Sequence, residues 1–447
     1  MSSQEKKSLK KQFFNYLIPS ICAMWVFSLY TIIDGIFVGK YVGPSALAAV
    51  NISMPFINII FAVSILFAIG SSTIIAMYLG KKQANKANST FTLGLVCLIT
   101  ISIVTFILIY FNIDSFAYFL GAEPNNINLV LKYLKTIVFF NGFFMISYYL
   151  EVLCKTDGSP YLSIIAVGVA ALTNVLLDYI FIAKLNMGIE GAAFATGLSQ
   201  ILSGAIFLSH FLSKRSTLKF AKFKINFKQI LRIVTIGFPD SLTELAAGIV
   251  ILLFNKYILM YIGENGVVAY SIISYTSSLV LMTMIGITQG MQPLVSYYFG
   301  KGSIKSVRYL FKMSITAILI ASITTFLLTN VFTSSIVSIF IDGSDPSLNN
   351  LANISLKIYS LTFLLMGFNI IISGFFSAIE KPAIATVISL SRGIVIIIAV
   401  LFISTKLLGA NGIWISTPIT ELLCLGISVI SIKRALGHSL NVQKKVA

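Results

Sequence analysis

A few ionisable side chains lie inside long apolar segments of this sequence, and they are the first candidates for chemistry. They are Asp34, Asp178, Asp240, Glu244, Arg392 and Glu421. A charged side chain at the centre of a bilayer costs about 2.5–3.5 kcal/mol on insertion scales, so each needs a partner or a function. Asn174 and Asp178 are four residues apart, so a helix places both side chains on the same face.

Asp34 and Asp178 are expected to lie at a similar depth, because each falls late in an apolar segment and both segments run in the same direction. Two carboxylates that face one cavity titrate as a coupled pair. Such a pair can take up a proton near neutral pH or hold Na⁺ between its oxygens. The alternative is a hydrogen-bonded structural cluster, or two helix-end residues at the membrane interface. We expect no resident cofactor and no other metal site.

Twelve apolar segments must position these residues. The chain has 447 residues, of which 57% are hydrophobic and 11% charged, and its mean hydropathy is +0.93. Soluble domains carry about 25% charged residues, so this composition excludes a water-soluble enzyme. Segments long enough to cross a bilayer, which takes about 20 apolar residues, are predicted throughout the chain. They are 13–38, 46–78, 91–111, 129–153, 161–183, 189–212, 230–260, 267–298, 307–331, 351–379, 383–405 and 411–435.

Lysine and arginine residues gather in every second connection between these segments. They are frequent before residue 13, in 79–90, 213–232 and 301–312, and after residue 432. Because basic loops stay in the cytoplasm, both termini are predicted to be cytoplasmic. The net charge of +17 then reflects orientation in a membrane. We expect contact with membrane lipid and no nucleic-acid partner.

The two halves of the chain are related by a shift of about 220 residues, which aligns Pro19 with Pro239 and Gly43 with Gly263. The predicted organisation is an N-lobe of six spans in 1–212, a linker in 213–229 and a C-lobe of six spans in 230–447. Both halves start on the same side, so the repeat is parallel, with its axis along the membrane normal. Substrate is expected between the halves, near the midplane.

The remaining charged residues have several interpretations. Arg392 is expected to pair with Glu421 or Glu244, either as a structural ion pair or with a role in gating. Asp240 follows Pro239 and is expected near cytoplasmic water. Glu151 and Asp157 fall near a segment end, where simple solvation would explain them.

Motifs of enzymes and of ATP-driven pumps are missing. The sequence contains no Gly-x-x-x-x-Gly-Lys-Ser/Thr loop, and its two histidines do not form a nucleophile–histidine–acid set. An enzyme is therefore not expected, and uphill transport would depend on an ion gradient.

Three stretches resemble the multidrug and toxic compound extrusion (MATE) family. The stretch from Asp34 to Pro55 (DGIFVGKYVGPSALAAVNISMP) looks like the end of its first span and the start of its second. The stretch from Gln289 to Tyr297 resembles its eighth-span motif, and the stretch from Asn174 to Phe181 is similar to its fifth span. The resemblance covers essentially the whole chain, and is closest to bacterial exporters of the MepA type in the DinF-like branch.

The resemblance implies a fold of two pseudo-symmetric six-helix lobes that enclose a V-shaped cavity. It implies a multi-pass, monomeric transporter of the bacterial plasma membrane. Such proteins export cationic or amphipathic drugs or metabolites by antiport with H⁺ or Na⁺, through rocker-type alternating access. The alternative is a lipid-linked oligosaccharide flippase of the related superfamily. Flippases tend to have a more cationic cavity, whereas here the acidic residues within the spans outnumber Arg392.

The resemblance also implies site residues in both lobes. The residues that match the cation site of DinF-like members are Asp34, Asn174, Asp178, Thr196 and Tyr133. Pro19 matches a first-span proline thought to bend as that site changes protonation.

The C-lobe departs from the NorM-like branch, which has acidic residues in spans 7 and 10. Glu244 falls about one turn earlier than that pattern requires, and 351–379 contains no acid, so a Na⁺ site in the C-lobe is not expected. The candidate polar or substrate-contacting residues there are Glu244, Arg392, Gln289, Gln292 and Glu421.

Overall fold

The computed structural model describes residues 1–341 and 345–445, with side chains described as far as residue 434. These residues are almost entirely helical, and no strand occurs among them. Among the described residues, twelve helices are long and apolar enough to cross a membrane, which confirms the predicted all-α membrane fold and its number of spans. Residues 342–344, 446 and 447, which belong to the predicted C-lobe, lie outside the described residues.

Each half supplies six of the spans, and several spans contain a short turn of different helical type. The first six are α1 with π-helical turn η1 (Ser3–Phe37, Val38–Val42), α2 (Pro44–Gly80), α3 (Ala84–Tyr110), α5 (Ile127–Thr156), α6 with π-helical turn η2 (Pro160–Asp178, Tyr179–Lys184) and α7 (Gly188–Leu212). The other six are α8 (Phe227–Tyr261), α9 (Glu264–Gly300), α10 (Ile304–Val331), α12–η3–α13 (Pro346–Ser360, Leu361–Leu364, Met366–Ala378), α14–η4–α15 (Pro382–Leu390, Ser391–Val395, Ile396–Leu408) and α16 (Ala410–Lys445).

The first helix begins ten residues before the predicted apolar segment, at Ser3 rather than 13. Ser2 and Glu5 form a capping box, in which the Ser2 hydroxyl accepts from the Glu5 N–H and the Glu5 carboxylate accepts from the Ser2 N–H. These bonds satisfy free N–H groups at the helix start. Hydropathy marks only the apolar part of a helix, so it misses this polar extension.

Two short helices that the sequence did not predict support the internal repeat. Helix α4 (Ile113–Phe119) follows the third span of the first half, and α11 (Thr333–Phe340) follows the third span of the second. Their first residues are 220 positions apart, the same shift that aligns Gly43 with Gly263. Both glycines have positive φ (111° and 87°), where a side chain would be strained, and each immediately precedes the second span of its half.

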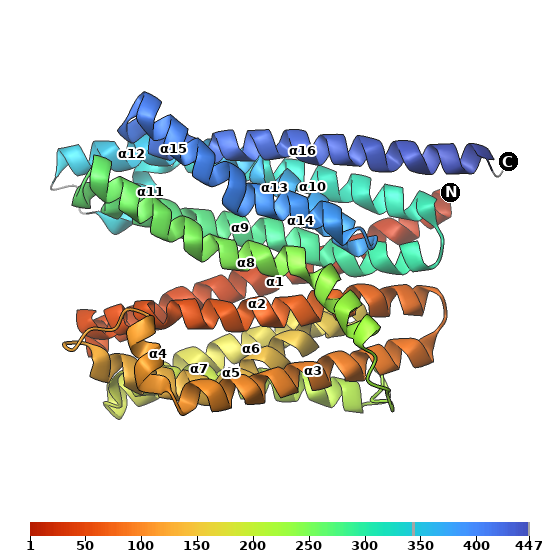
Figure 1. The fold of residues 1–447 in the computed structure, drawn as a ribbon, viewed down its shortest axis with the longest axis horizontal. Coiled ribbons are helices and arrows are strands. Elements are labelled where there is room, and N and C mark those ends of the chain that lie inside the picture. The colour runs from red at the N-terminus through yellow and green to blue at the C-terminus, as the bar shows by residue number, and fades with distance from the viewer. Residues whose placement is uncertain (342–344, 446–447) are drawn as a thin grey trace.

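The helices form two lobes, and the first helix of each half starts in the core of the opposite lobe (Figure 1). Leu9 and Phe13 of α1 are buried in a core with α9, α10, α13 and α14. Ile233 and Ile236 of α8 are buried in the core of the first half. The packing therefore crosses the predicted chain division at 213–229, and the two lobes exchange the starts of their first helices.

Close helix crossings join the lobes at the end of the molecule where α1 starts and α16 ends (Figure 1). A Cβ atom at Gly80, the last residue of α2, would collide with the carbonyl of Tyr297 in α9. A Cβ atom at Gly300, the last residue of α9, would collide with the backbone of Met77 in α2. Glycine at both positions allows the two helices to touch through their backbones.

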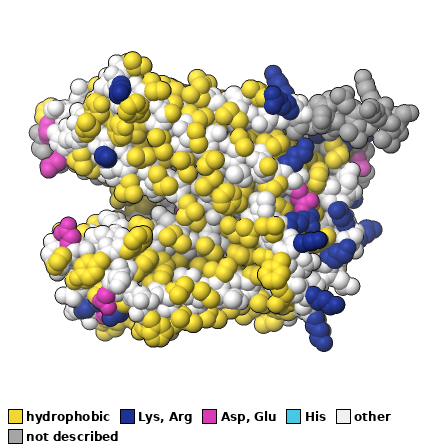
Figure 2. Space-filling model, viewed as in Figure 1, with side chains coloured by type: hydrophobic (Ala, Val, Ile, Leu, Met, Phe, Trp, Pro, Cys, Tyr) yellow, Lys and Arg dark blue, Asp and Glu magenta, His cyan; other side chains and the backbone are white. Residues whose placement is uncertain are grey.

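The surface separates into a polar end and a broad apolar belt (Figure 2). Most of the visible lysine and arginine side chains lie at the same end as these crossings. Hydrophobic side chains cover both lobes between the two ends, as a lipid-facing surface requires. A hollow separates the lobes at the opposite end, so in this conformation the lobes meet at the basic end and part at the other (Figure 2).

The connection between the halves is held against the first half by Asp157, which was expected to be solvated. Asp157 is 9% exposed, and its Oδ1 accepts from the N–H groups of Thr217 (2.9 Å) and Leu218 (3.0 Å). Its Oδ2 lies 2.8 Å from His210 Nε2. The expectation of solvation is wrong because the linker folds back over the end of α5.

Candidate functional site

A cavity of about 290 Å³ lies between the two lobes and is lined by residues of both halves. Its wall combines apolar and aromatic side chains with a few charged and amide groups. Helices α1, α2, α5, α6 and α7 form one side, and α8, α9, α13, α14 and η4 form the other. Cavities of this kind typically bind small organic molecules, with the few polar groups fixing orientation.

Asp34 lines this cavity, and Asp178 lies behind it, completely buried. The two carboxyl groups are near enough for the charge of one to affect the other, although no hydrogen bond joins them. Both oxygens of Asp178 and Oδ1 of Asp34 are buried and have no hydrogen-bond partner among the described residues. An ionised carboxylate without hydrogen bonds is unfavourable in a low-dielectric site. A proton or a cation at this pair would therefore be stabilising.

The other predicted members of the cation site surround the two carboxyl groups. Asn174, also completely buried, donates from Nδ2 to Thr196 Oγ1 over 3.3 Å, and its Oδ1 has no hydrogen-bond partner among the described residues. Tyr133 is 4% exposed, lines the cavity and lies near both aspartates. The structure thus brings the five predicted residues together from α1, α5, α6 and α7. Their role in binding an ion remains a prediction.

Pro19 lies inside the continuous helix α1, away from the carboxylates. It is 15 residues before Asp34, about 22 Å along the helix axis. A Cβ atom at Gly286 of α9 would lie 2.7 Å from the Cα of Ile21, and one at Gly290 would lie 3.0 Å from the Cα of Leu17. Pro19 therefore falls where α9 packs most closely on α1.

Arg392 forms its ion pair with Glu421, and not with Glu244. Arg392 Nε donates to Glu421 Oε1 over 2.5 Å, and Glu421 Oε2 accepts from Asn369 Nδ2 over 2.7 Å. Ser428 Oγ donates to Asn369 Oδ1 over 2.8 Å. Arg392 lines the cavity, whereas Glu421 is 2% exposed and lies in the wall behind it. Glu421 is therefore placed to hold Arg392 and not to meet a substrate.

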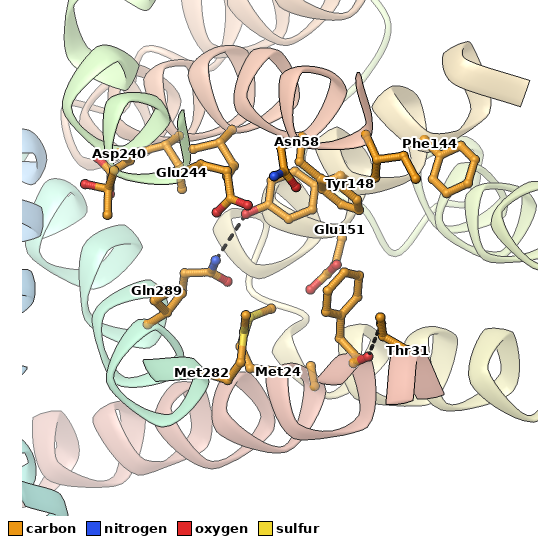
Figure 3. A pocket seen from close by; sticks show the side chains of 18 of the residues that line it. Met24, Thr31, Asn58, Phe144, Tyr148, Glu151, Asp240, Glu244, Met282 and Gln289 are labelled. Carbon is orange, nitrogen blue, oxygen red and sulfur yellow. Dashed lines mark hydrogen bonds between the residues drawn. The ribbon is translucent and has the colours of Figure 1, made fainter. Parts of the chain in front are cut away.

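Asp240 is a cavity residue that the sequence reasoning placed near cytoplasmic water (Figure 3). It accepts from Ser377 Oγ over 3.2 Å and from Gln292 Nε2 over 3.4 Å. The expectation was wrong because α8 starts at Phe227, which puts Asp240 about 20 Å inside the helix. Gln292, a predicted polar residue of the C-lobe, therefore orients Asp240 as well as lining the cavity.

Glu151 was also expected to be solvated, but it is 7% exposed and lines the cavity (Figure 3). Its Oε1 accepts from Lys155 Nζ over 2.8 Å, and Lys155 is 1% exposed. Lys155 Nζ also donates to Gln289 Oε1 over 3.0 Å, and Gln289 Nε2 donates to Tyr148 OH over 3.2 Å. The i, i+4 spacing of Glu151 and Lys155 could have revealed this pair from the sequence.

Glu244 faces the same part of the cavity, close to Tyr148 and Asn58 (Figure 3). It has no ion-pair partner among the described residues. Glu244, Asp34 and Asp240 all line the cavity. Their carboxylates outnumber the single guanidinium group of Arg392 in the described part of the wall. Aromatic rings and carboxylates in one cavity suit an amphipathic cation.

Twelve spans in two related halves around one central cavity define a multi-pass membrane transporter. The sequence profile of the MatE family matches residues 19–180 and 241–403. The chain belongs to this family, the MATE transporters.

Relatives and solved structures agree with the assignment. The multidrug export protein MepA of Staphylococcus saprophyticus is 25% identical over 444 residues, which cover 98% of this chain and 97% of the relative. MepA of Staphylococcus haemolyticus is 26% identical over 452 residues, which cover 98% of this chain and 96% of the relative. An outward-facing multidrug resistance MATE transporter of the MOP superfamily has a TM-score of 0.91 at 21% identity, with 96% of both chains covered. A crystal structure of MATE in complex with MaL6 has a TM-score of 0.91 at 20% identity, with 98% and 97% covered.

Proposed function

We propose that this protein is a secondary transporter that exports cationic or amphipathic small molecules, drugs among them, in exchange for H⁺ or Na⁺. The observation that carries the proposal is the position of Asp34 on the cavity wall, with Asp178 buried directly behind it. A charge change at this pair alters the attraction between the cavity and a cation. The names of the MepA relatives support drugs as one class of cargo.

In the proposed cycle, the ionised pair attracts a cationic cargo from the cytoplasm. After the lobes rock outward, a proton or Na⁺ neutralises the pair, and the cargo leaves. A coupling free energy of about 1.4 kcal/mol between ion and cargo changes cargo affinity tenfold. The return to the inward-facing state requires the Gly80 and Gly300 crossings to separate, because they close the basic end.

The basic end is the proposed cytoplasmic end, which puts both termini in the cytoplasm of a bacterial cell. The hollow between the lobes then faces outward, and the conformation is the one from which cargo leaves. The protein would work as a monomer in the plasma membrane, surrounded by lipid.

The donor set at the aspartate pair suits a proton or Na⁺. The carboxylate oxygens of Asp34 and Asp178, with Asn174 Oδ1 and Thr196 Oγ1, are hard oxygen donors of the kind that alkali and alkaline-earth cations prefer. A carboxylate pair also accepts a proton. The acidic cavity favours cationic cargo over the pyrophosphate-linked cargo of a flippase.

The test is efflux of a fluorescent cationic dye from proteoliposomes, with ΔpH and ΔNa⁺ imposed separately. We expect one of the two gradients to drive dye movement against its own concentration gradient. Protein-dependent movement that neither gradient accelerates, or no movement at all, would contradict coupled export.

A further inference from the structure

Arg392 has hydrogen-bonding capacity that its ion pair does not use. The guanidinium group carries five N–H donors and keeps its charge at every physiological pH. Only Nε is bonded, to Glu421 Oε1. The two terminal Nη groups make no hydrogen bond with a described residue, yet they are not sealed from solvent. The Arg392 side chain is 17% exposed and lines the cavity, so these donors are reachable from it.

The surroundings hold the charge of Arg392 in place. Both oxygens of Glu421 are engaged, one by Arg392 and one by Asn369, and the Glu421 side chain is 3% exposed. No other carboxylate of a described residue lies within ion-pair distance of Arg392. Arg392 lies in the π-helical turn Ser391–Val395, and such turns occur often at functional sites.

Neutral hydroxyl groups from three helices line the wall next to the preceding turn of the same span. Ser389 Oγ lies 3.1 Å from Ser373 Oγ and accepts from Thr243 Oγ1 over 3.3 Å, and all three residues line the cavity with Arg392. Hydroxyl groups can turn their protons toward an anion. This part of the wall therefore offers a cation and rotatable donors, whereas Asp34 on the opposite lobe offers a carboxylate.

We propose that the Arg392 guanidinium is an anion-binding subsite of the cavity. It holds the carboxylate of a zwitterionic amphipathic cargo whose cationic group lies toward Asp34. The inference rests on the proposed function, because the cargo enters the same cavity. A planar guanidinium with free Nη groups binds a carboxylate through two parallel hydrogen bonds.

The test compares two dyes that differ only in a carboxylate. Rhodamine 110 is a zwitterion with a free carboxylate, and rhodamine 123 is its methyl ester and a simple cation. Fluorescence anisotropy measures the binding of each dye to the purified full-length protein. We expect the wild type to bind both dyes. Arg392→Lys keeps the charge beside Glu421 but loses the paired N–H donors of the guanidinium. It should weaken the binding of rhodamine 110 about tenfold and that of rhodamine 123 less than twofold.

A second variant distinguishes loss of the subsite from misfolding. Arg392→Gln combined with Glu421→Gln removes both charges, so no unpaired buried charge is left. It should show the same selective loss as Arg392→Lys, at an unchanged thermal midpoint in detergent. Ser428→Ala, which removes only the outer hydrogen bond to Asn369, is the control and should leave both dyes bound.

Selective loss of rhodamine 110 in both variants supports the subsite. Wild-type affinity for rhodamine 110 in both variants, equal loss of the two dyes, or failure of the wild type to bind rhodamine 110 overturns it. The proposed function is judged separately, by the gradient-driven efflux of rhodamine 123 from wild-type proteoliposomes. Efflux without the selective loss of rhodamine 110 binding contradicts only the subsite. The selective loss of rhodamine 110 binding without efflux contradicts only the proposed transport.

Discussion

Lys155 Nζ in α5 lies 3.0 Å from Gln289 Oε1 in α9, so a hydrogen bond from a buried ammonium group joins the two lobes. Lys155 is next to the last residue of α5, and the bond therefore lies between the cavity and the basic end. In the proposed transport cycle, the inward-facing conformation has to break this bond. The same ammonium group keeps its bond to Glu151 within α5, so it does not lose every partner when the lobes part.

Gln289→Leu should shift the population toward inward-facing conformations, because it removes this bond while Lys155 stays paired with Glu151. Pairs of spin labels across the basic end should report longer distances than in the wild type. Gln292→Leu is the matched control, because Gln292 lies on the same helix and bonds Asp240 within the second half. Unchanged distances in Gln289→Leu, or the same change in both variants, would argue that the Lys155–Gln289 bond does not hold the basic end closed.

Asp34→Asn and Asp178→Asn should each abolish drug resistance in an efflux-deficient host, since each removes one of the two carboxylates proposed to bind the coupling ion. Growth in drug gradients measures resistance, and immunoblotting of membranes checks that protein levels are unchanged. Asp114→Asn, at an exposed position in α4, is the control and should keep resistance. Wild-type resistance from either cavity variant would refute the proposed site.

Pro19→Ala should lower the transport rate more than drug affinity. A proline inside a helix removes a backbone hydrogen bond and permits bending, and Pro19 lies where α1 packs on α9 but away from the lining carboxylates. Dye efflux gives the rate, and anisotropy gives the affinity. Pro55→Ala in α2 is the control, because Pro55 is also inside a helix but its side chain is exposed. Equal losses of rate and affinity in Pro19→Ala would count against a hinge.

Gly80→Ala should destabilise the observed conformation, because the added methyl group collides with the Tyr297 carbonyl. We expect a lower thermal midpoint in detergent and slower efflux. Gly168→Ala is the control, since a Cβ atom there meets nothing within 4 Å, and alanine is favoured over glycine in a helix by about 0.5–1 kcal/mol. A Gly80→Ala protein as stable as the Gly168→Ala protein would show that the crossing tolerates the extra atom.

Hydropathy and charge identified the membrane class and the twelve spans, because a bilayer imposes length and composition on each span separately. The fifth-span pair Asn174 and Asp178 could also be recognised, since spacing along one helix fixes a shared face. These features depend on residues near each other in the chain. The repeat was recognised from the proline and glycine residues that a shift of 220 positions aligns. The short helices α4 and α11 were missed, because seven or eight residues carry too weak a pattern.

Contacts between distant helices could be decided only by the tertiary structure. The sequence offered Glu421 and Glu244 as partners of Arg392, and packing of α16 against the span that contains Arg392 selected Glu421. It placed Glu151 and Asp240 at solvated ends, whereas the structure buries Glu151 beside Lys155 and turns Asp240 into the cavity. A linear sequence gives the position of each side chain along its own span. What a side chain contacts on its side of the helix is decided only when the neighbouring helices have packed.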